Sequence, residues 1–258
     1  MKKFVSDLVV SDNVKLNDQY FLLKVKSNVD LPPMLPGQFV EIKVEDSPST
    51  FLRRPISINF VDKESNEIWL LIQIVGEGTR KLSQLIAGSS INIIYPLGNT
   101  FSTPPTKDAE LLLVGGGVGI APLLFWGSEL ASKGYRCSFL LGGRSVENLL
   151  LLDEFKQYGS VYLTTEDGSA GEKGFVTHHS ILGNHHFDAI YSCGPTPMMK
   201  AVASYAHSKH IFCEVSLENT MACGFGACLC CVTETTDGNI CVCTEGPVFN
   251  ITKLKWQI

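Results

Sequence analysis

The first hundred residues alternate between short apolar runs and polar turns. The runs FLLKVKS, GQFVEIKV, RRPISINFV, EIWLLIQIV and SINIIYPLG are rich in β-branched and aromatic residues, and Gly, Pro, Asp and Asn separate them. Short strands at this spacing predict a small antiparallel β-barrel or sandwich. One helix is expected from about Thr79 to Ala87, with Gly88 as its C-cap.

The pattern changes after the proline-rich polar stretch STPPTKDAE at residues 102–110. Strand-like runs (ELLLVGG, CSFLLGG, SVYLTTED and DAIYSCG) then alternate with helix-like runs (GIAPLLFWGSELASKG, ENLLLLDEFKQYG and PTPMMKAVASYAHSKH). This alternation predicts an α/β domain with a parallel sheet and helices on both faces. Residues 216–258 are too few for a core of their own and should need a metal or a docking surface. We therefore expect an α+β multidomain chain divided into residues 1–101, 102–215 and 216–258.

Charge and composition exclude several classes of protein. The chain has 258 residues, a net charge of −5 and no basic run, so nucleic acid and anionic membrane surfaces are poor partners. The uncharged stretch from Leu111 to Ser128 contains Gly115, Gly116, Gly117, Gly119 and Pro122, which favours a strand, a turn and a helix over a membrane span. Asp7 and Asp12 interrupt any signal-peptide core, so we expect a cytoplasmic protein.

Seven of the nine cysteines lie between Cys213 and Cys243. Within this group, Cys223, Cys228 and Cys231 have the spacing C-x4-C-x2-C, and Cys243 follows, as in plant-type ferredoxins that hold a [2Fe–2S] cluster. Zinc is the alternative, although zinc sites favour paired C-x2-C units and only one fits here. The remaining candidates are Cys230 and Cys241.

Two segments of the first domain suggest a bound dinucleotide. In the run Arg53-Arg54-Pro55-Ile56-Ser57, a guanidinium can clamp a pyrophosphate and the serine hydroxyl can reach a flavin ring. Farther on, Gly76-Glu77-Gly78-Thr79 leads into the expected helix, whose N-terminus would suit an anion. The alternative is a surface arginine pair and an ordinary N-cap threonine.

The second domain contains a glycine-rich turn between a strand and a helix. The turn contains Gly115, Gly116, Gly117 and Gly119, which permit a diphosphate to approach the backbone, although G-x-G-x-x-G is absent and the turn could serve packing alone. Cys193 precedes a second such turn and could equally be a buried apolar residue. The pairs His178-His179 and His185-His186 are interpreted as surface or loop residues, because adjacent side chains do not face one another.

These motifs together resemble a known family. Arg54-Pro55-Ile56-Ser57 is similar to the R-x-Y-S flavin motif of the ferredoxin–NADP reductase superfamily, with Ile56 where an aromatic residue often lies. The chain as a whole resembles the electron-transfer subunit of class 1B dihydroorotate dehydrogenase. The motifs that carry this resemblance are LRRPISI, GEGT, GGGVGIAPL, TEDGS with KGFVT, CGPTPMM, and MACGFGACLCC with CTEGPVF.

The resemblance implies a barrel domain that binds FAD, a domain that binds NAD(H), and a C-terminal [2Fe–2S] segment. It places Cys193 near the nicotinamide and the flavin edge. It implies that the FAD is lined by Arg54, Pro55, Ile56, Ser57, Gly78 and Thr79, with Leu71, Ile72 and Gln73 along its ring, and that the cluster is bound by Cys223, Cys228, Cys231 and Cys243. It also implies a heterotetramer with an FMN-containing catalytic subunit that oxidises dihydroorotate to orotate.

The expected function is electron transfer between that partner and NAD⁺ through the cluster and FAD, with no general acid or base. A second hypothesis is an NAD(P)H-dependent ferredoxin or sulfur-compound reductase subunit, and a third, from another class, is a non-enzymatic zinc-binding scaffold. Glu166 and Asp167 after a strand predict NAD(H) over NADP(H), because they would repel a 2′-phosphate. Arg144 argues the other way.

Overall fold

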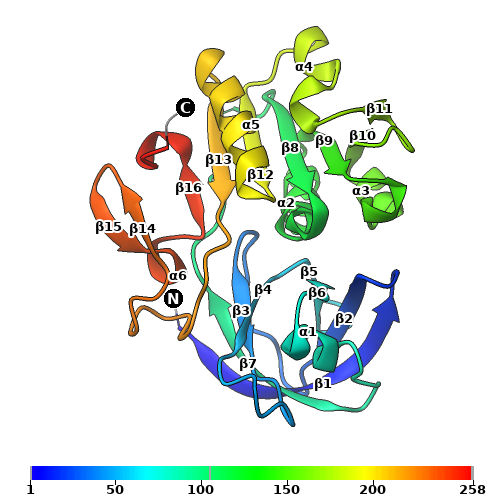
Figure 1. The fold of residues 1–258 in the computed structure, drawn as a ribbon, viewed down its shortest axis with the longest axis vertical. Helices are drawn as coiled ribbons and strands as arrows, with labels where there is room; N and C mark the ends of the chain where they lie inside the picture. Colours follow the sequence, from blue (N-terminus) through cyan, green and yellow to red (C-terminus); the bar gives the residue numbers. More distant parts are fainter. Residues whose placement is uncertain (1, 105, 257–258) are drawn as a thin grey trace. The chain divides into compact units, whose positions relative to one another are not determined.

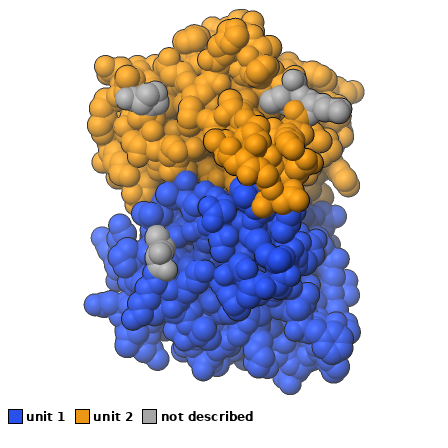
Figure 2. Space-filling model, turned by 90° about the vertical axis from the view of Figure 1, so that its left-hand side faces the viewer, with its two compact units in different colours: residues 1–100, 219–233, 240–247 blue, residues 101–218, 234–239, 248–258 orange. Residues whose placement is uncertain are grey.

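The computed structural model describes residues 2–104 and 106–256, so residue 105 of the proline-rich stretch and both chain ends lie outside the description. The chain forms two compact units (Figure 2). Unit 1 consists of Met1–Thr100, Asn219–Thr233 and Ile240–Pro247, and unit 2 of Phe101–Glu218, Glu234–Asn239 and Val248–Ile258. The cysteine segment thus contributes to both units, and the division into three domains stays a prediction.

Unit 1 is built on a seven-stranded sheet in the order β4-β3-β7-β1-β2-β6-β5, whose strand pairs are antiparallel (Figure 1). The sheet curves into a half-barrel, which confirms the antiparallel domain predicted from the sequence. Its strands are β1 (Phe4–Lys15), β2 (Tyr20–Lys26), β3 (Phe39–Ile42), β4 (Arg54–Ser57), β5 (Phe60–Asp62), β6 (Glu67–Gln73) and β7 (Ser90–Leu97).

The helix of the first hundred residues, α1 (Glu77–Leu82), begins earlier than predicted and ends at Leu82 rather than at Ala87. The Asn13 side-chain amide donates to the carbonyls of Leu82 (3.2 Å) and Leu85 (2.8 Å). These bonds satisfy carbonyls that a longer helix would use, so the helix stops there. Gly88, expected as the C-cap, instead adopts φ +90° where the chain turns into β7.

Unit 2 contains a second seven-stranded sheet, in the order β11-β10-β9-β8-β12-β13-β16. Its pairs are parallel except for β13 with β16, so the predicted parallel sheet is confirmed. Its strands are β8 (Glu110–Gly116), β9 (Arg136–Gly143), β10 (Gly159–Thr165), β11 (Glu172–Lys173), β12 (Ala189–Cys193), β13 (Phe212–Ser216) and β16 (Val248–Asn250).

The remaining elements are helical connections and a cysteine-segment hairpin. The α-helices are α2 (Ala121–Ser132), α3 (Leu152–Lys156), α4 (Ile181–Asn184), α5 (Thr196–Ser208) and α6 (Val242–Glu245). The 3₁₀ turns are η1 (Gly117–Ile120), η2 (Val146–Asn148), η3 (Val176–His178) and η4 (Ile251–Lys253). The hairpin pairs β14 (Val232–Thr235) with β15 (Gly238–Cys241).

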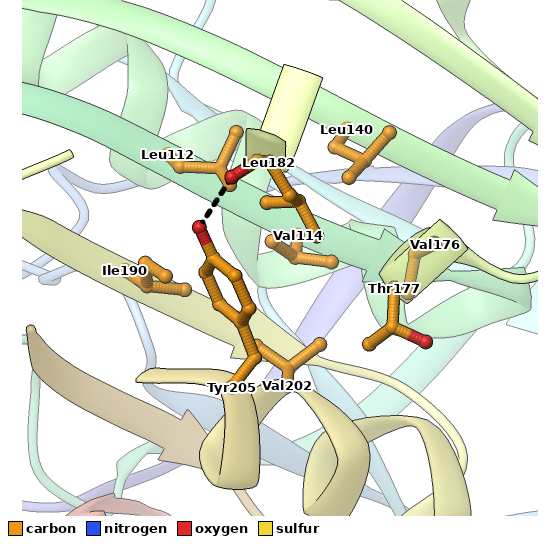
Figure 3. A pocket seen from close by; sticks show the side chains of 9 residues that line it. All are labelled: Leu112, Val114, Leu140, Val176, Thr177, Leu182, Ile190, Val202 and Tyr205. Carbon is orange, nitrogen blue, oxygen red and sulfur yellow. Dashed lines mark hydrogen bonds between the residues drawn. The ribbon is translucent and has the colours of Figure 1, made fainter. Parts of the chain in front are cut away.

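Helices cover both faces of the unit 2 sheet, as predicted. Neighbouring strand residues point to opposite faces. On one face, Phe139 packs edge-on against Phe155 of α3, and a Cβ at Gly127 of α2 would lie 2.4 Å from its ring. On the other face, Leu140 and strand residues of β8 and β12 meet α4, η3 and α5 around a cavity of about 10 Å³ (Figure 3). A cavity of that volume holds one water at most, so it is a packing void and not a ligand site.

One predicted helix is much shorter than expected. The run ENLLLLDEFKQYG contains a 3₁₀ turn, η2, and a short helix, α3, separated by an extended Leu149 and by Leu151 at φ 55°. Four consecutive leucines do not have the 3.6-residue period of an amphipathic helix, and a left-handed residue cannot lie inside one. Within residues 2–104 and 106–256, no helix is long and apolar enough to cross a membrane.

Candidate functional site

The two adjacent arginines of unit 1 have different surroundings. Arg53 Nη1 donates to the carbonyl oxygens of Glu41 (3.3 Å) and Asn92 (3.1 Å), and its Nη2 donates to Asn92 Oδ1 (2.5 Å). Arg54 opens β4, and among the described residues its guanidinium donates hydrogen bonds only to the Leu52 carbonyl, from Nε (3.2 Å) and Nη2 (2.7 Å). Arg53 therefore holds neighbouring strands together, whereas Arg54 keeps donors for a phosphate.

The strands beside Arg54 offer mainly backbone groups. Pro55, Ile56 and Ser57 are half-buried on β4. Leu71 and Ile72 of β6 are each 1% exposed, so their side chains belong to the core. On β6, pairing with β5 ends at Trp69, whereas pairing with β2 continues to Gln73. Within the described chain, backbone N–H and C=O groups beyond Trp69 therefore lack a second strand partner, and they suit the donors and acceptors of a planar ring.

The turn before α1 is fixed by local hydrogen bonds. The Thr79 hydroxyl accepts from the N–H groups of Val75 (2.9 Å) and Gly76 (3.2 Å). Glu77, in the first helical turn, accepts from Ser47 (3.1 Å) and Ser49, which ties the loop before β4 to the helix. Because α1 is short and begins with a carboxylate, its N-terminus alone makes no anion site. A positive charge comes instead from Arg54, whose Cδ would lie 3.5 Å from a Cβ on Gly78.

In unit 2, two glycine turns meet. A Cβ at Gly119 would lie 2.4 Å from the Cα of Gly194, and one at Gly115 would lie 2.8 Å from Ile120 Cγ2. At these two positions glycine serves packing, which is the alternative considered for the sequence. Gly117, in η1, has φ +56° and continues from the strand end at Gly116. The backbone at Gly116 and Gly117 therefore forms the part of the turn suited to a diphosphate.

Cys193 ends β12 and is 1% exposed. Burial, and then the carboxylate of Glu218, raise the pKa of its thiol well above the ordinary value. The residue is therefore a neutral thiol and not a nucleophilic thiolate.

The expected surface histidines include one exception. His179 is 8% exposed, its Nδ1 accepts from the Ile181 N–H (3.1 Å), and its Nε2 lies 3.6 Å from Glu172. His179 is therefore a loop residue, as one of the two alternatives predicted, but its ring is buried and faces Tyr162.

The cysteine turn of unit 1 favours a thiolate. Gly224 and Gly226 have φ +75° and +89°, which lets the chain wrap around Cys223. Burial opposes ionisation of Cys223, but the N–H groups of Phe225, Cys228 and Ala227 outweigh it and lower its pKa to about 6. Amides directed at sulfur are the surroundings that an iron–sulfur ligand needs.

Of the other three candidate ligands, Cys228 is exposed and the remaining two are buried side by side. Cys231 and Cys243 are 2% and 1% exposed, and the Cys243 N–H donates to Cys231 Sγ (3.3 Å). Burial and the Cys231 thiol raise the pKa of Cys243 to about 12, so the Cys243 thiol ionises only beside a cation. Among the described residues, no three His, Cys, Asp or Glu side chains are already arranged around a metal position. The fit of this segment to an iron–sulfur cluster therefore rests on its cysteine thiols and on the amide-lined turn around Cys223.

Known protein families match both the cysteine segment and the domain that contains the glycine turns. Residues 218–255 match the iron–sulfur cluster binding domain of dihydroorotate dehydrogenase B, and residues 113–204 match an oxidoreductase NAD-binding domain. The chain is 38% identical to the dihydroorotate dehydrogenase B (NAD(+)) electron transfer subunit of Fusobacterium nucleatum, over 95% of this chain and 96% of that protein. The chain belongs to this family of electron transfer subunits. The Listeria monocytogenes member is 42% identical over 86% of this chain and 88% of that protein.

Solved structures agree with the fold. A structure described as an NADH-dependent reduced ferredoxin–NADP oxidoreductase is 30% identical, covers 96% of this chain and 90% of its own, and has a TM-score of 0.87. The cytochrome b5 reductase domain of Ulva prolifera nitrate reductase, at 15% identity and a TM-score of 0.67, covers 81% of this chain and 94% of its own and shares the fold alone. The family is one of oxidoreductases, so the zinc-binding scaffold is set aside.

One buried charged residue of unit 1 was not singled out from the sequence. Glu41 is 0% exposed, and neither carboxylate oxygen has a hydrogen-bond partner in the described structure. The sequence does contain a sign of it, because Glu41 is a charged residue inside the otherwise apolar strand FVEI. A carboxylate at that place should attract attention because buried charges are rarely left unpaired.

Proposed function

We propose that the chain passes electrons between an FMN-containing dihydroorotate dehydrogenase catalytic subunit and NAD⁺, using FAD and a [2Fe–2S] cluster held by Cys223, Cys228, Cys231 and Cys243. The observation that carries this proposal is the amide-lined turn around Cys223, within a segment that matches the family's cluster-binding domain. A flavin exchanges two electrons with a nicotinamide as hydride and exchanges single electrons with a cluster, which is the chemistry these groups supply when bound.

The chain's own residues bind and orient. Arg54 clamps the FAD pyrophosphate, with Gly78 and Thr79 shaping the turn beside it. The Ser57 hydroxyl and the free backbone edge of Leu71-Ile72-Gln73 bind the flavin ring through hydrogen bonds. The backbone of Gly115, Gly116, Gly117 and Gly119 shapes the dinucleotide turn, and Cys193 supplies a neutral wall near the nicotinamide. None of these residues needs to act as a general acid or base.

The partner and the compartment belong to the same proposal. The family name implies a catalytic subunit, and we assign the assembly as a heterotetramer. All nine cysteines are unpaired, as suits a reducing cytoplasm.

The deciding experiment is co-purification with a dihydroorotate dehydrogenase catalytic subunit from the same organism, followed by an assay of dihydroorotate-dependent NAD⁺ reduction. The isolated chain should oxidise NADH with artificial acceptors and show no activity with dihydroorotate. A complex that reduces NAD⁺ with reduced ferredoxin but not with dihydroorotate would instead support the ferredoxin reductase function, which the 30% identity to the ferredoxin–NADP oxidoreductase structure favours.

NADH should be preferred over NADPH by at least roughly tenfold in kcat/KM, which corresponds to about 1.4 kcal/mol. Glu166 and Asp167 follow β10 and are exposed, and the Ser169 hydroxyl and N–H hold the pKa of Asp167 below its ordinary value. These acidic side chains would repel a 2′-phosphate. The double variant Glu166→Gln/Asp167→Asn should have a smaller preference for NADH over NADPH. Equal kcat/KM values for NADH and NADPH in the unchanged chain would contradict the prediction.

The exposed apolar residues of the cysteine segment should form part of the partner's docking face. Phe225, Leu229 and Val232 are 46%, 65% and 38% exposed. Apolar side chains in contact at an interface do not tolerate a carboxylate. Leu229→Glu and Phe225→Glu should weaken assembly on gel filtration without loss of cluster absorption. Val5→Glu, at a 64% exposed position of the same unit, is the control. If both Leu229→Glu and Phe225→Glu still assemble fully with the catalytic subunit, the partner does not dock on this face.

A further inference from the structure

Glu41 lies on β3, the second strand from one edge of unit 1's sheet, and its carboxylate has no hydrogen-bond partner among the described residues. It stands opposite Pro55 of β4 and Ile94 of β7, so one of its neighbours belongs to the strand assigned to the flavin. Its side chain is 0% exposed, and both carboxylate oxygens lack a partner among the described residues. An unpaired buried carboxylate is unfavourable for folding and calls for a functional explanation.

The side chain of Glu41 reaches the cysteine turn. A Cβ built on Gly224 would lie 2.6 Å from Glu41 Cγ and 3.1 Å from Glu41 Oε1. The glutamate therefore occupies the space that a side chain at position 224 would need. Gly224 follows Cys223 directly and has φ +75°, so both its conformation and its space require glycine.

Charges of both signs act on this carboxylate. Burial raises the pKa of Glu41 to about 7, while Arg54 and Arg53 lower it and Cys223 raises it. Glu41 thus lies within electrostatic range of the arginine assigned to the FAD pyrophosphate and of a cysteine assigned to the cluster.

We propose that Glu41 is a positioning residue for the iron–sulfur cluster, which fixes the turn at Gly224 by direct contact and sets the cluster's reduction potential through its negative charge. This inference rests on the ligand set proposed above. A negative charge near a cluster disfavours the added electron, so the carboxylate lowers the potential. A structural role alone would explain the contact but not an effect on the potential.

The first test compares the potential of the cluster in Glu41→Gln with that in the unchanged holoprotein, by redox titration at several pH values. Glutamine keeps the shape and removes the charge. The potential should move in the positive direction, with unchanged iron content and visible circular dichroism. An unchanged or more negative potential would overturn the proposal.

The second test measures the contact by iron content and visible absorption. Gly224→Ala should lose most of the cluster, and the double variant Gly224→Ala/Glu41→Ala should regain part of it, because the second change removes Glu41 Cγ. Gly226→Ala is the matched control, since it has φ +89° but its Cβ would meet Thr244 Cγ2 at 2.8 Å instead. Glu41→Ala should not rescue Gly226→Ala. Equal rescue of both, or full retention of the cluster by Gly224→Ala, would contradict the contact.

Failure of this inference and failure of the proposed ligand set give different results. If Cys223→Ser keeps an intact cluster, the ligand set is wrong. If Cys223→Ser loses the cluster while Glu41→Gln leaves the potential unchanged, only the role of Glu41 is wrong.

Discussion

Cys231→Ser is expected to abolish the visible iron–sulfur absorption, whereas Cys230→Ser should retain it. The two residues are adjacent, but Cys231 is 2% exposed and accepts a hydrogen bond from the Cys243 N–H, while Cys230 is exposed and its thiol lies 3.7 Å from the Thr220 carbonyl. A ligand set with C-x4-C-x2-C spacing also selects Cys231. Iron content and absorption of the two purified variants measure the difference.

The same comparison applies at the end of the segment. Cys243 is buried and Cys241 is half-buried, so Cys243→Ser should lose the cluster and Cys241→Ser should keep it. These four variants form two matched pairs, in which each control has the same chemistry and nearly the same position. If Cys230→Ser loses the absorption and Cys231→Ser keeps it, Cys230 and not Cys231 is the ligand.

Arg54→Ala is expected to weaken FAD binding by roughly tenfold to a hundredfold, since a charge-assisted hydrogen bond contributes about 1.5–3 kcal/mol. Arg54 begins β4, and its guanidinium hydrogen bonds only the Leu52 carbonyl among the described residues. The measurement is FAD retained after dialysis, together with a fluorescence titration of the apoprotein.

The choice of control matters here. Arg53 is unsuitable, because its bonds to Glu41 and Asn92 join strands and its removal would disturb the sheet. Arg136→Ala in unit 2 removes the same group from a surface ion pair with Glu110 (2.6 Å) and should leave FAD content unchanged. FAD content in Arg54→Ala equal to that of the unchanged chain would refute the assignment.

The sequence predicts elements well where one strand or helix has a strong local pattern. The apolar runs of β8, β9 and β12 and the helices α2 and α5 fall within the predicted segments. Strand β1 was not predicted, because along its length only Leu8 and Val10 are buried and charged residues interrupt the alternation. Strand β16 was also missed, since its partner β13 lies far away in the chain and short strands have little signal of their own.

The candidate site shows the same limit. Cysteine spacing is a local pattern, so four ligands can be proposed from it. The difference between Arg53 and Arg54 depends on which strands each side chain faces, and neither residue's own neighbours in the sequence reveal it. The role of Glu41 is harder still to predict, because it depends on Gly224, which lies more than 180 residues farther along the chain.

The pairing of β13 with β16 has a consequence for how the family could have arisen. Ser216 lies opposite Val248, Val215 opposite Phe249 and Glu214 opposite Asn250, so the chain leaves the sheet and returns to it at neighbouring strands. Strand partners are about 4.8 Å apart, a gap that a tight turn can bridge. The intervening cysteine segment is therefore, in topological terms, an insertion whose removal would leave the order of the sheet intact. A reductase without a cluster could gain or lose such an insertion in one genetic step, without any other strand changing its place.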